Sequence, residues 1–236
     1  MAHYVFDVDG TLTPSRQAID PQFNSFFCRF IDNHSVSLVT GSDIAKTKEQ
    51  LGTLIPNRVE YCFNCSGSDI WSGPINIYTN KWEIPYVARC WLKDKLEESS
   101  FDLRTGNHIE DRPSLVNFSV VGRNATPNER KLYVEYDKKT NERQIIADLF
   151  NKEFINLEAK VGGETGIDIG PKGSNKSQIL KWIKDDEIHF FGDAMHPGGN
   201  DEPLKIALDD YPKSKCYHVD NWQETASILR GLDKTI

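Results

Sequence analysis

The chain has 236 residues, enough for one large domain or two small ones. Lys and Arg number 28 and Asp and Glu 35, and a net charge of −7 argues against a nonspecific nucleic-acid-binding protein, which normally carries a basic surplus. No segment approaches the ~20 apolar residues that a membrane span needs. The N-terminus also lacks the basic and then apolar pattern of a signal peptide. We therefore expect a cytoplasmic protein that binds neither membranes nor nucleic acids.

Three short apolar runs each end in small, hydroxyl or acidic residues. Their continuous rather than alternating apolarity predicts strands that are covered on both faces, as in a parallel sheet flanked by helices. Ligands of such sheets bind beyond the carboxyl ends of the strands, so we expect the polar residues that follow the runs to meet at one site. The runs are residues 4–6, 36–39 and 188–191, and the polar residues after them include Asp7, Asp9, Ser42 and Asp193.

Apolar residues at helical spacing predict helices in the same part of the chain. The phenylalanines within residues 21–33 form a stripe that we interpret as core, because such stripes are far more often core than ligand platforms. The predicted helices are residues 21–33, 43–54, 174–184 and 221–232.

The middle of the chain has a different pattern. Residues 115–121 alternate loosely between apolar and polar, which predicts a half-exposed antiparallel strand. Helices at 127–137 and 142–152 and strands at 155–161 and 166–169 complete an α+β insert. We therefore predict a doubly wound α/β core with a parallel sheet, formed by residues 1–81 and 172–236, and an inserted α+β domain at 82–171. The linkers at 80–83 and 171–174 would act as hinges.

The five cysteines are odd in number and scattered, which fits reduced thiols better than a disulfide framework. Cys62 and Cys65 form a Cys-x-x-Cys pair, but no Cys or His nearby supplies the two further ligands of a zinc site. We interpret the pair as buried or half-buried thiols near a strand end.

The strongest local signal is Asp7-Val8-Asp9-Gly10-Thr11. Two carboxylates at the end of a buried strand are costly unless a cation or a reaction compensates for them. Asp7 can attack phosphorus and form an aspartyl-phosphate, while Asp9 can protonate a leaving oxygen or deprotonate an acceptor. The alternatives are a turn rich in Asx residues and a calcium loop. An EF-hand lacks support because Ala18 stands where its closing Glu would be.

Residues 6–14, Phe-Asp-Val-Asp-Gly-Thr-Leu-Thr-Pro, resemble motif I of the haloacid dehalogenase (HAD) superfamily, whose members transfer phosphoryl groups through an Asp nucleophile with Mg²⁺. Further motifs follow in order: Thr40-Gly41-Ser42, Lys176, and Gly192-Asp193 with Gly198-Gly199-Asn200-Asp201. This resemblance implies a Rossmann-like HAD core with the inserted domain as its cap. It makes Asp7 the nucleophile and Asp9 the general acid/base, and it assigns phosphate binding to Ser42 and Lys176. It also implies that Asp7, the Asp9 carbonyl and Asp193 hold Mg²⁺, with Asn200 and Asp201 orienting the metal shell.

Residues 7–17 and 197–201 are similar to the eukaryotic-type phosphomannomutase family, of cap subclass IIB. In the insert, Arg112, Arg123 and Arg130 resemble cap arginines that grip the distal phosphate of the substrate. The resemblance adds Arg16 and Asp168 to the substrate-binding residues, and it implies a hexose phosphate or hexose bisphosphate substrate and a homodimer formed through the caps. The chain departs from the family at Gly166, where a Ser is usual, and at Ser174-Asn175, where Trp-Asp is usual.

Three functions remain open. The first is a phosphomannomutase that interconverts mannose 1-phosphate and mannose 6-phosphate, the second a HAD-type sugar-phosphate phosphatase, and the third a non-enzymatic binding module. The complete set of catalytic carboxylates disfavours the third. The insert arginines favour the mutase, because a mutase must hold a phosphate at both ends of the sugar. Gly166 favours the phosphatase, because it removes a hydroxyl contact to the sugar phosphate.

Overall fold

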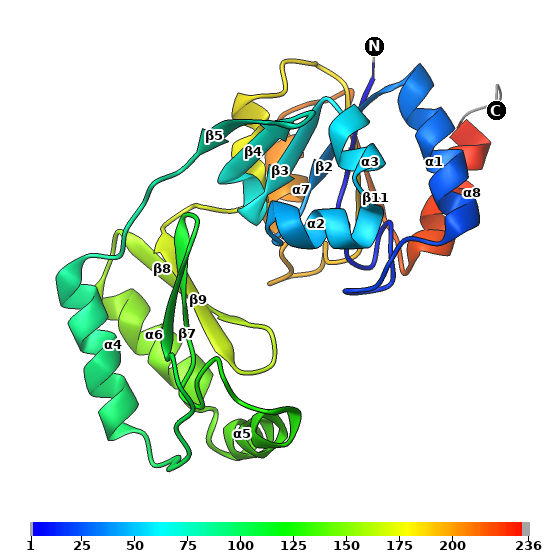
Figure 1. Ribbon diagram of the computed structural model, residues 1–236. Coiled ribbons are helices and arrows are strands. Elements are labelled where there is room, and N and C mark those ends of the chain that lie inside the picture. Colours follow the sequence, from blue (N-terminus) through cyan, green and yellow to red (C-terminus); the bar gives the residue numbers. More distant parts are fainter. Residues whose placement is uncertain (1, 233–236) are drawn as a thin grey trace. The chain divides into compact units, whose positions relative to one another are not determined.

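A computed structural model describes residues 2–232 (Figure 1). The chain forms two compact units. The first, called the core unit, comprises residues 1–79 and 174–236; the second, called the insert unit, comprises residues 80–173. The insert unit is thus one continuous stretch, whereas the core unit is assembled from both ends of the chain.

The core unit contains a seven-stranded sheet with the order β11-β10-β1-β2-β3-β4-β5. The pairs from β11 to β3 are parallel, which confirms the predicted α/β fold, while the last two pairs are antiparallel and were not predicted. The three predicted strands are confirmed as β1, β2 and β10. The strands are β1 His3–Phe6, β2 Ser35–Val39, β3 Tyr61–Asn64, β4 Asp69–Ser72, β5 Ile75–Thr79, β10 Ile188–Gly192 and β11 Lys215–His218.

Helices cover both faces of this sheet. They are α1 Pro21–Asn33, α2 Ile44–Leu51, α3 Leu54–Arg58, α7 Glu202–Leu208 and α8 Trp222–Leu232, with the 3₁₀ helices η1 Cys65–Gly67 and η2 Lys176–Lys181. Successive residues of β1 point to opposite faces: Phe6 packs with residues of α1 and α8, whereas Val5 packs with residues of η2 and α7. This two-sided packing confirms the doubly wound arrangement (Figure 1).

The predicted helices differ in how well they match. Helix α1 spans the predicted residues 21–33, because the Asp20 side chain accepts hydrogen bonds from two main-chain N–H groups of its first turn. Helix α2 ends at Leu51 rather than at residue 54, since Gly52 takes a φ of 70°. The predicted helix 174–184 is wrong in type: the structure has the 3₁₀ helix η2. Gln178 of η2 is tied to the Ser66 carbonyl, with Nε2 2.7 Å from the oxygen.

The insert unit is an antiparallel sheet of four strands in the order β6-β7-β9-β8, packed with helices, as the α+β prediction requires. Its strands are β6 Ile109–Arg112, β7 Leu115–Phe118, β8 Leu157–Gly162 and β9 Gly166–Pro171, and its helices are α4 Tyr86–Glu98, α5 Pro127–Thr140 and α6 Glu142–Glu153. Helix α4 was not predicted, because it buries only Ala88 and Leu92 and so lacks a continuous apolar stripe. None of the helices in residues 2–232 has the length and hydrophobicity that crossing a bilayer requires.

Candidate active site

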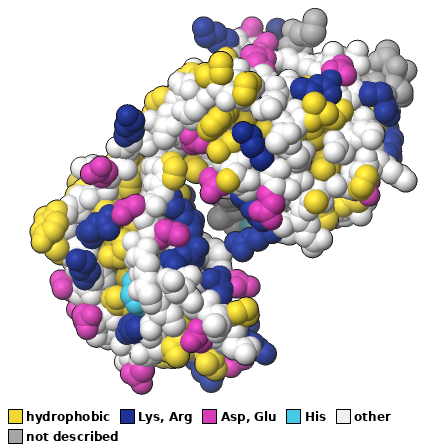
Figure 2. Space-filling view, in the orientation of Figure 1, with side chains coloured by type: hydrophobic (Ala, Val, Ile, Leu, Met, Phe, Trp, Pro, Cys, Tyr) yellow, Lys and Arg dark blue, Asp and Glu magenta, His cyan; other side chains and the backbone are white. Residues whose placement is uncertain are grey.

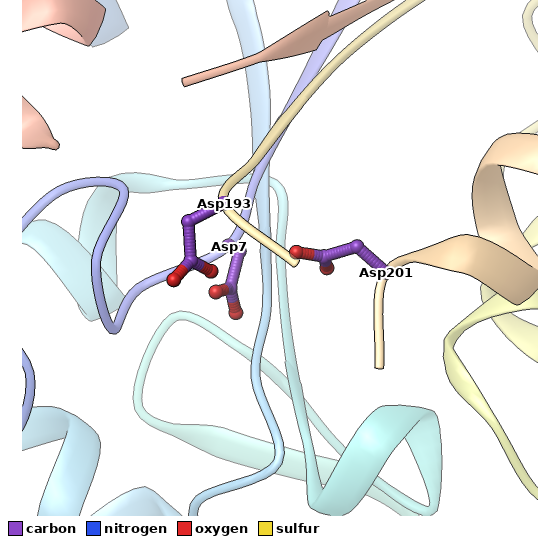
Figure 3. A group of neighbouring side chains, drawn as sticks. All are labelled: Asp7, Asp193 and Asp201. Atoms are coloured by element: carbon purple, nitrogen blue, oxygen red, sulfur yellow. The ribbon is translucent and has the colours of Figure 1, made fainter. Parts of the chain in front are cut away.

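Three aspartates meet in the core unit at the carboxyl ends of β1 and β10. Asp7 follows β1, Asp193 follows β10, and Asp201 precedes α7. Each offers a carboxylate oxygen within 4.8 Å of the others, and Figure 3 shows the three side chains arriving from separate segments. Asp7 and Asp193 come together because β1 and β10 are adjacent parallel strands. Their proximity confirms the expectation that polar residues after these strands share one site.

Lys176 is the positive partner of this acidic cluster. Its Nζ lies 2.5 Å from Asp7 Oδ1 and 2.7 Å from Asp201 Oδ1, and the side chain is completely buried. Burial alone lowers the pKa of Lys176, but Asp7 and Asp201 outweigh it and raise the pKa above its ordinary value. The ammonium group is therefore charged, and it joins the start of η2 to the end of β1.

One ammonium group does not balance three carboxylates. Burial, with a further contribution from Asp201 and Asp193, raises the pKa of Asp7 to about 8 against the opposing effect of Lys176. Burial and Asp201 likewise raise the pKa of Asp193. The unbalanced negative charge and the hard oxygen donors suit a divalent cation such as Mg²⁺. A Cβ at Gly10 would lie 2.3 Å from Asp193 Oδ2, so the glycine leaves the space that lets this carboxylate reach the site.

Asp9 lies outside the group of three carboxylates. Its Oδ1 accepts hydrogen bonds from the main-chain N–H of Arg16, at 2.5 Å, and from Gln50 Nε2, at 2.8 Å. The loop from Asp9 to Arg16 turns at Gly10, which has a φ of 77°. Arg16 is exposed and has a φ of 58°. The third carboxylate of the acidic cluster therefore belongs to Asp201 and not to Asp9. The predicted contact of Asp9 with the metal uses its main-chain carbonyl.

Ser42 stands where β2 leads into α2. Its main-chain N–H donates to Thr40 Oγ1 at 3.1 Å, and its carbonyl accepts from Cys65 N–H at 2.9 Å. The side chain is half-buried, and β2 is the neighbour of β1 in the sheet. The loop that carries Ser42 is thus fixed at the same edge of the sheet as Asp7.

In the insert unit, two of the predicted arginines gather around one carboxylate. Arg112 Nε and Nη2 lie 2.8 and 2.6 Å from Glu110 Oε2, and Arg123 Nε lies 3.1 Å from the same oxygen. Arg112 Nη1 is also 3.9 Å from Asp168 Oδ1. Arg130, on α5, pairs instead with Glu164 at 3.2 Å. Figure 2 shows Lys and Arg side chains at several places on this unit, with acidic side chains among them.

Glu110 was missed by the sequence reasoning. The signal was nevertheless present, because Glu110 and Arg112 are two residues apart in a strand and therefore share one face of the sheet. Gln50 was missed as well, since nothing local in α2 connects it to Asp9.

Asn117 explains the glycine at position 166. Asn117 Nδ2 donates to Asp168 Oδ1 at 2.6 Å, across the pair of strands β7 and β9. A Cβ at Gly166 would lie 2.5 Å from the same Nδ2. The Asn117 amide thus occupies the space that a Ser side chain would need, and Asp168 is held by an amide from the neighbouring strand.

The fold is shared with solved phosphatases. A trehalose-6-phosphate phosphatase related protein matches with a TM-score of 0.59 and 18% identity over 97% of this chain and 96% of its own. The C-terminal domain of the Candida albicans trehalose-6-phosphate phosphatase matches with a TM-score of 0.64 and 18% identity over 98% of this chain and 91% of its own. At such identities the likeness concerns the fold alone.

Comparison with known sequences shows the family of this chain. A family model described as eukaryotic phosphomannomutase matches residues 23–234. The phosphomannomutase of Arabidopsis thaliana is 32% identical over 97% of this chain and 95% of its own length, and a probable phosphomannomutase of Caenorhabditis elegans is 33% identical over 97% and 96%. The chain belongs to the eukaryotic phosphomannomutase family and is an enzyme of the HAD phosphotransferase type.

Proposed function

We propose that this enzyme is a magnesium-dependent phosphomannomutase that interconverts mannose 1-phosphate and mannose 6-phosphate through an aspartyl-phosphate at Asp7. Membership of the family supports the reaction class. One observation carries the choice of a mutase: Arg112 and Arg123 meet around Glu110 in the insert unit, whereas the acidic cluster belongs to the core unit. Two guanidinium groups side by side suit a second phosphate, which a phosphatase does not need to hold.

Asp7 is the proposed nucleophile. Its Oδ1 is engaged by Lys176, which leaves Oδ2 to attack phosphorus while the bond from phosphorus to the sugar oxygen breaks. Lys176 and Ser42 would offset the negative charge of the transferring group. Mg²⁺, held by Asp7, the Asp9 carbonyl and Asp193, would supply further positive charge for the ionised nucleophile and the phosphoryl group. The pKa of Asp7, about 8, makes this added charge necessary at neutral pH.

Asp9 is the proposed general acid and base. It gives its proton to the sugar oxygen that leaves phosphorus, and it takes a proton from the sugar hydroxyl that attacks the aspartyl-phosphate in the reverse transfer. A hexose bisphosphate loads Asp7 by giving up one phosphoryl group and leaving as a monophosphate. In each cycle that follows, the aspartyl-phosphate gives its phosphoryl group to the substrate monophosphate, and the bound bisphosphate so formed returns its other phosphoryl group to Asp7 and leaves as the isomeric monophosphate. Asp9 ends each cycle in the protonation state in which it began.

Substrate binding is assigned to Arg16 and to the insert residues Arg112, Arg123, Arg130 and Asp168. The arginines would hold the phosphate that is not being transferred, and Asp168 would accept hydrogen bonds from the sugar. A homodimer formed through the insert units and a cytoplasmic location complete the proposal.

Paired assays test the proposal. Mutase turnover of mannose 1-phosphate and glucose 1-phosphate is measured with and without hexose 1,6-bisphosphate, beside release of inorganic phosphate. We expect bisphosphate-stimulated mutase turnover that Asp7→Asn and chelation both abolish, since loss of a nucleophile costs several orders of magnitude. Retention of a tenth of the turnover by Asp7→Asn would contradict the covalent mechanism, and activity under full chelation would contradict the metal.

The second candidate is a sugar-phosphate phosphatase, which Gly166 favours because it lacks a hydroxyl. Arg123→Ala distinguishes the two candidates. For a mutase, this change removes charge-assisted hydrogen bonds worth about 1.5–3 kcal/mol, so that kcat/KM falls roughly ten- to hundredfold for hexose phosphates and little for p-nitrophenyl phosphate. Equal losses for both substrates, together with phosphate release that exceeds mutase turnover, would identify a phosphatase.

A further inference from the structure

Gln50 lies against Asp9 and uses both of its amide hydrogens in the same region. Its Nε2 is 2.8 Å from Asp9 Oδ1 and 3.2 Å from Thr13 Oγ1. The side chain is 1% exposed, and within residues 2–232 its Oε1 has no hydrogen-bond partner. The amide is thus held by its nitrogen end, because a carboxylate accepts hydrogen bonds and cannot donate them.

Two N–H donors therefore converge on one oxygen of Asp9. The second is the main-chain N–H of Arg16, 2.5 Å from the same Oδ1. A carboxyl oxygen that faces two N–H groups cannot also carry a hydroxyl hydrogen without directing it at a donor. When Asp9 is protonated, the proton must accordingly sit on Oδ2.

We propose that Gln50 is a positioning residue that confines the transferable proton of Asp9 to Oδ2 and holds this oxygen ready for the leaving group. The inference rests on the proposed function and deepens it by naming the atom that carries the proton. It differs from a purely structural role for Gln50. The structural link between α2 and the loop before α1 is made by the main chain, where Ile19 N–H donates to the Gln50 carbonyl at 2.9 Å, and any side-chain variant keeps it.

The test uses two variants that keep the size of the side chain. Gln50→Met removes the N–H donor, and Gln50→Glu replaces the amide with a carboxylate that only accepts; the second variant serves if the first does not fold. Glu49→Met is the matched control, because Glu49 is the neighbouring residue in α2 and its side chain is 69% exposed. Thermal melts establish that each variant is folded.

Leaving-group dependence gives the readout. With Mg²⁺ present, kcat/KM is measured for phenyl phosphate, whose leaving group needs a proton, and for p-nitrophenyl phosphate, whose leaving group departs without one. The ratio kcat/KM covers only the steps up to departure of the leaving group. We expect both Gln50 variants to lose about ten- to hundredfold on phenyl phosphate and less than about threefold on p-nitrophenyl phosphate. Glu49→Met should change neither. Equal losses on the two substrates, or none, would overturn the inference.

Crystal structures of the wild type and Gln50→Met in one crystal form give an independent readout. We expect a single Asp9 conformer in the wild type, with Oδ1 facing Gln50, and a rotated or divided carboxylate in the variant. An unchanged Asp9 in the variant would overturn the inference even if the enzyme is active. If the wild type turns over no aryl or sugar phosphate with Mg²⁺, the proposed function fails, while the structures still decide whether Gln50 orients Asp9.

Discussion

Lys176 shows how much of the core unit depends on one charge. It is fully buried and bonded to Asp7 and Asp201, so its removal leaves two buried carboxylates facing each other without a cation. We expect Lys176→Met to lower the free energy of unfolding by about 3–5 kcal/mol at neutral pH in the presence of a chelator. Denaturant titration of the chelated protein measures this loss.

The control for this prediction is Lys46→Met. Lys46 pairs with Glu49 on the surface of α2, and such pairs contribute little, so the change should stay within about 0.5 kcal/mol. A loss below about 1 kcal/mol for Lys176→Met would mean that the carboxylates accommodate each other without it.

Gly166 and Asn117 form a coupled pair of residues. A Ser at position 166 would place its Cβ against the Asn117 amide, so we expect Gly166→Ser to destabilise the insert unit by about 1–3 kcal/mol. Adding Asn117→Ala removes the obstacle. The double variant should therefore lose less stability than the sum of the two single variants, as measured by thermal unfolding. Additive losses would show that the amide moves aside freely.

The thiol of Cys62 should be inert in the folded protein. Cys62 lies within β3 and is fully buried, and burial raises its pKa to about 12. Because the thiolate is the reactive form, iodoacetamide at pH 8 should label the half-buried Cys28 and Cys90 well before Cys62. Mass spectrometry of timed samples checks the order, and labelling in denaturant should remove it. Early modification of Cys62 would contradict its placement.

At the scale of the element, the predicted bounds were most accurate where a capping residue and a stripe of core side chains indicate the same helix. Helix α1 has the capping Asp20 before it and a phenylalanine stripe within it, and its bounds were predicted correctly. Strands β3, β4, β5 and β11 were not predicted. Both β5 and β11 are edge strands without fully buried residues, and an edge strand needs no continuous apolar run.

The residues of the site likewise differ in how far the sequence could predict them. Asp7 and Asp193 could be brought together from the sequence, because both follow predicted strands of one parallel sheet; the structure adds that these strands are neighbours. Gln50 could not be assigned in the same way, since it contacts Asp9, which a distant segment of the chain supplies. Sequence patterns record periodicity within an element, whereas the contact between Gln50 and Asp9 depends on the packing between elements.

Helix α5 offers a test of a single element. Thr126 Oγ1 accepts from Glu129 N–H while the Glu129 carboxylate accepts from Thr126 N–H, which forms a capping box. Thr126→Ala should cost about 0.5–2 kcal/mol, and Thr126→Ser should cost much less because it keeps the acceptor. Hydrogen exchange of the α5 amides measures both changes. Equal protection in the two variants would show that packing, rather than the cap, holds the helix.

At the scale of the whole molecule, the insert unit has the features of an independent folding unit. It is continuous in the chain, and its buried hydrophobic cluster, from Ile84 to Ile169, lies entirely within residues 80–173. We expect the fragment 80–173 to fold alone and to unfold cooperatively, as measured by circular dichroism and amide NMR dispersion. A protein that joins residues 1–79 directly to residues 174–236 is measured in the same way for comparison. A fragment without dispersed amide signals would show that the insert depends on the core unit.

The sheet order of the core unit also determines when the protein can be completed during its synthesis. Strand β1 lies between β2 and β10, but β10 is made only after the whole insert. At ribosomal rates of about 5–20 residues per second, the edge of β1 that receives β10 waits roughly 10–40 s for its partner. During this interval the unpaired edge of the apolar strand β1 can pair with strands of other nascent chains. Chaperones that shield strand edges should therefore matter more for the yield of this protein than for its stability once folded.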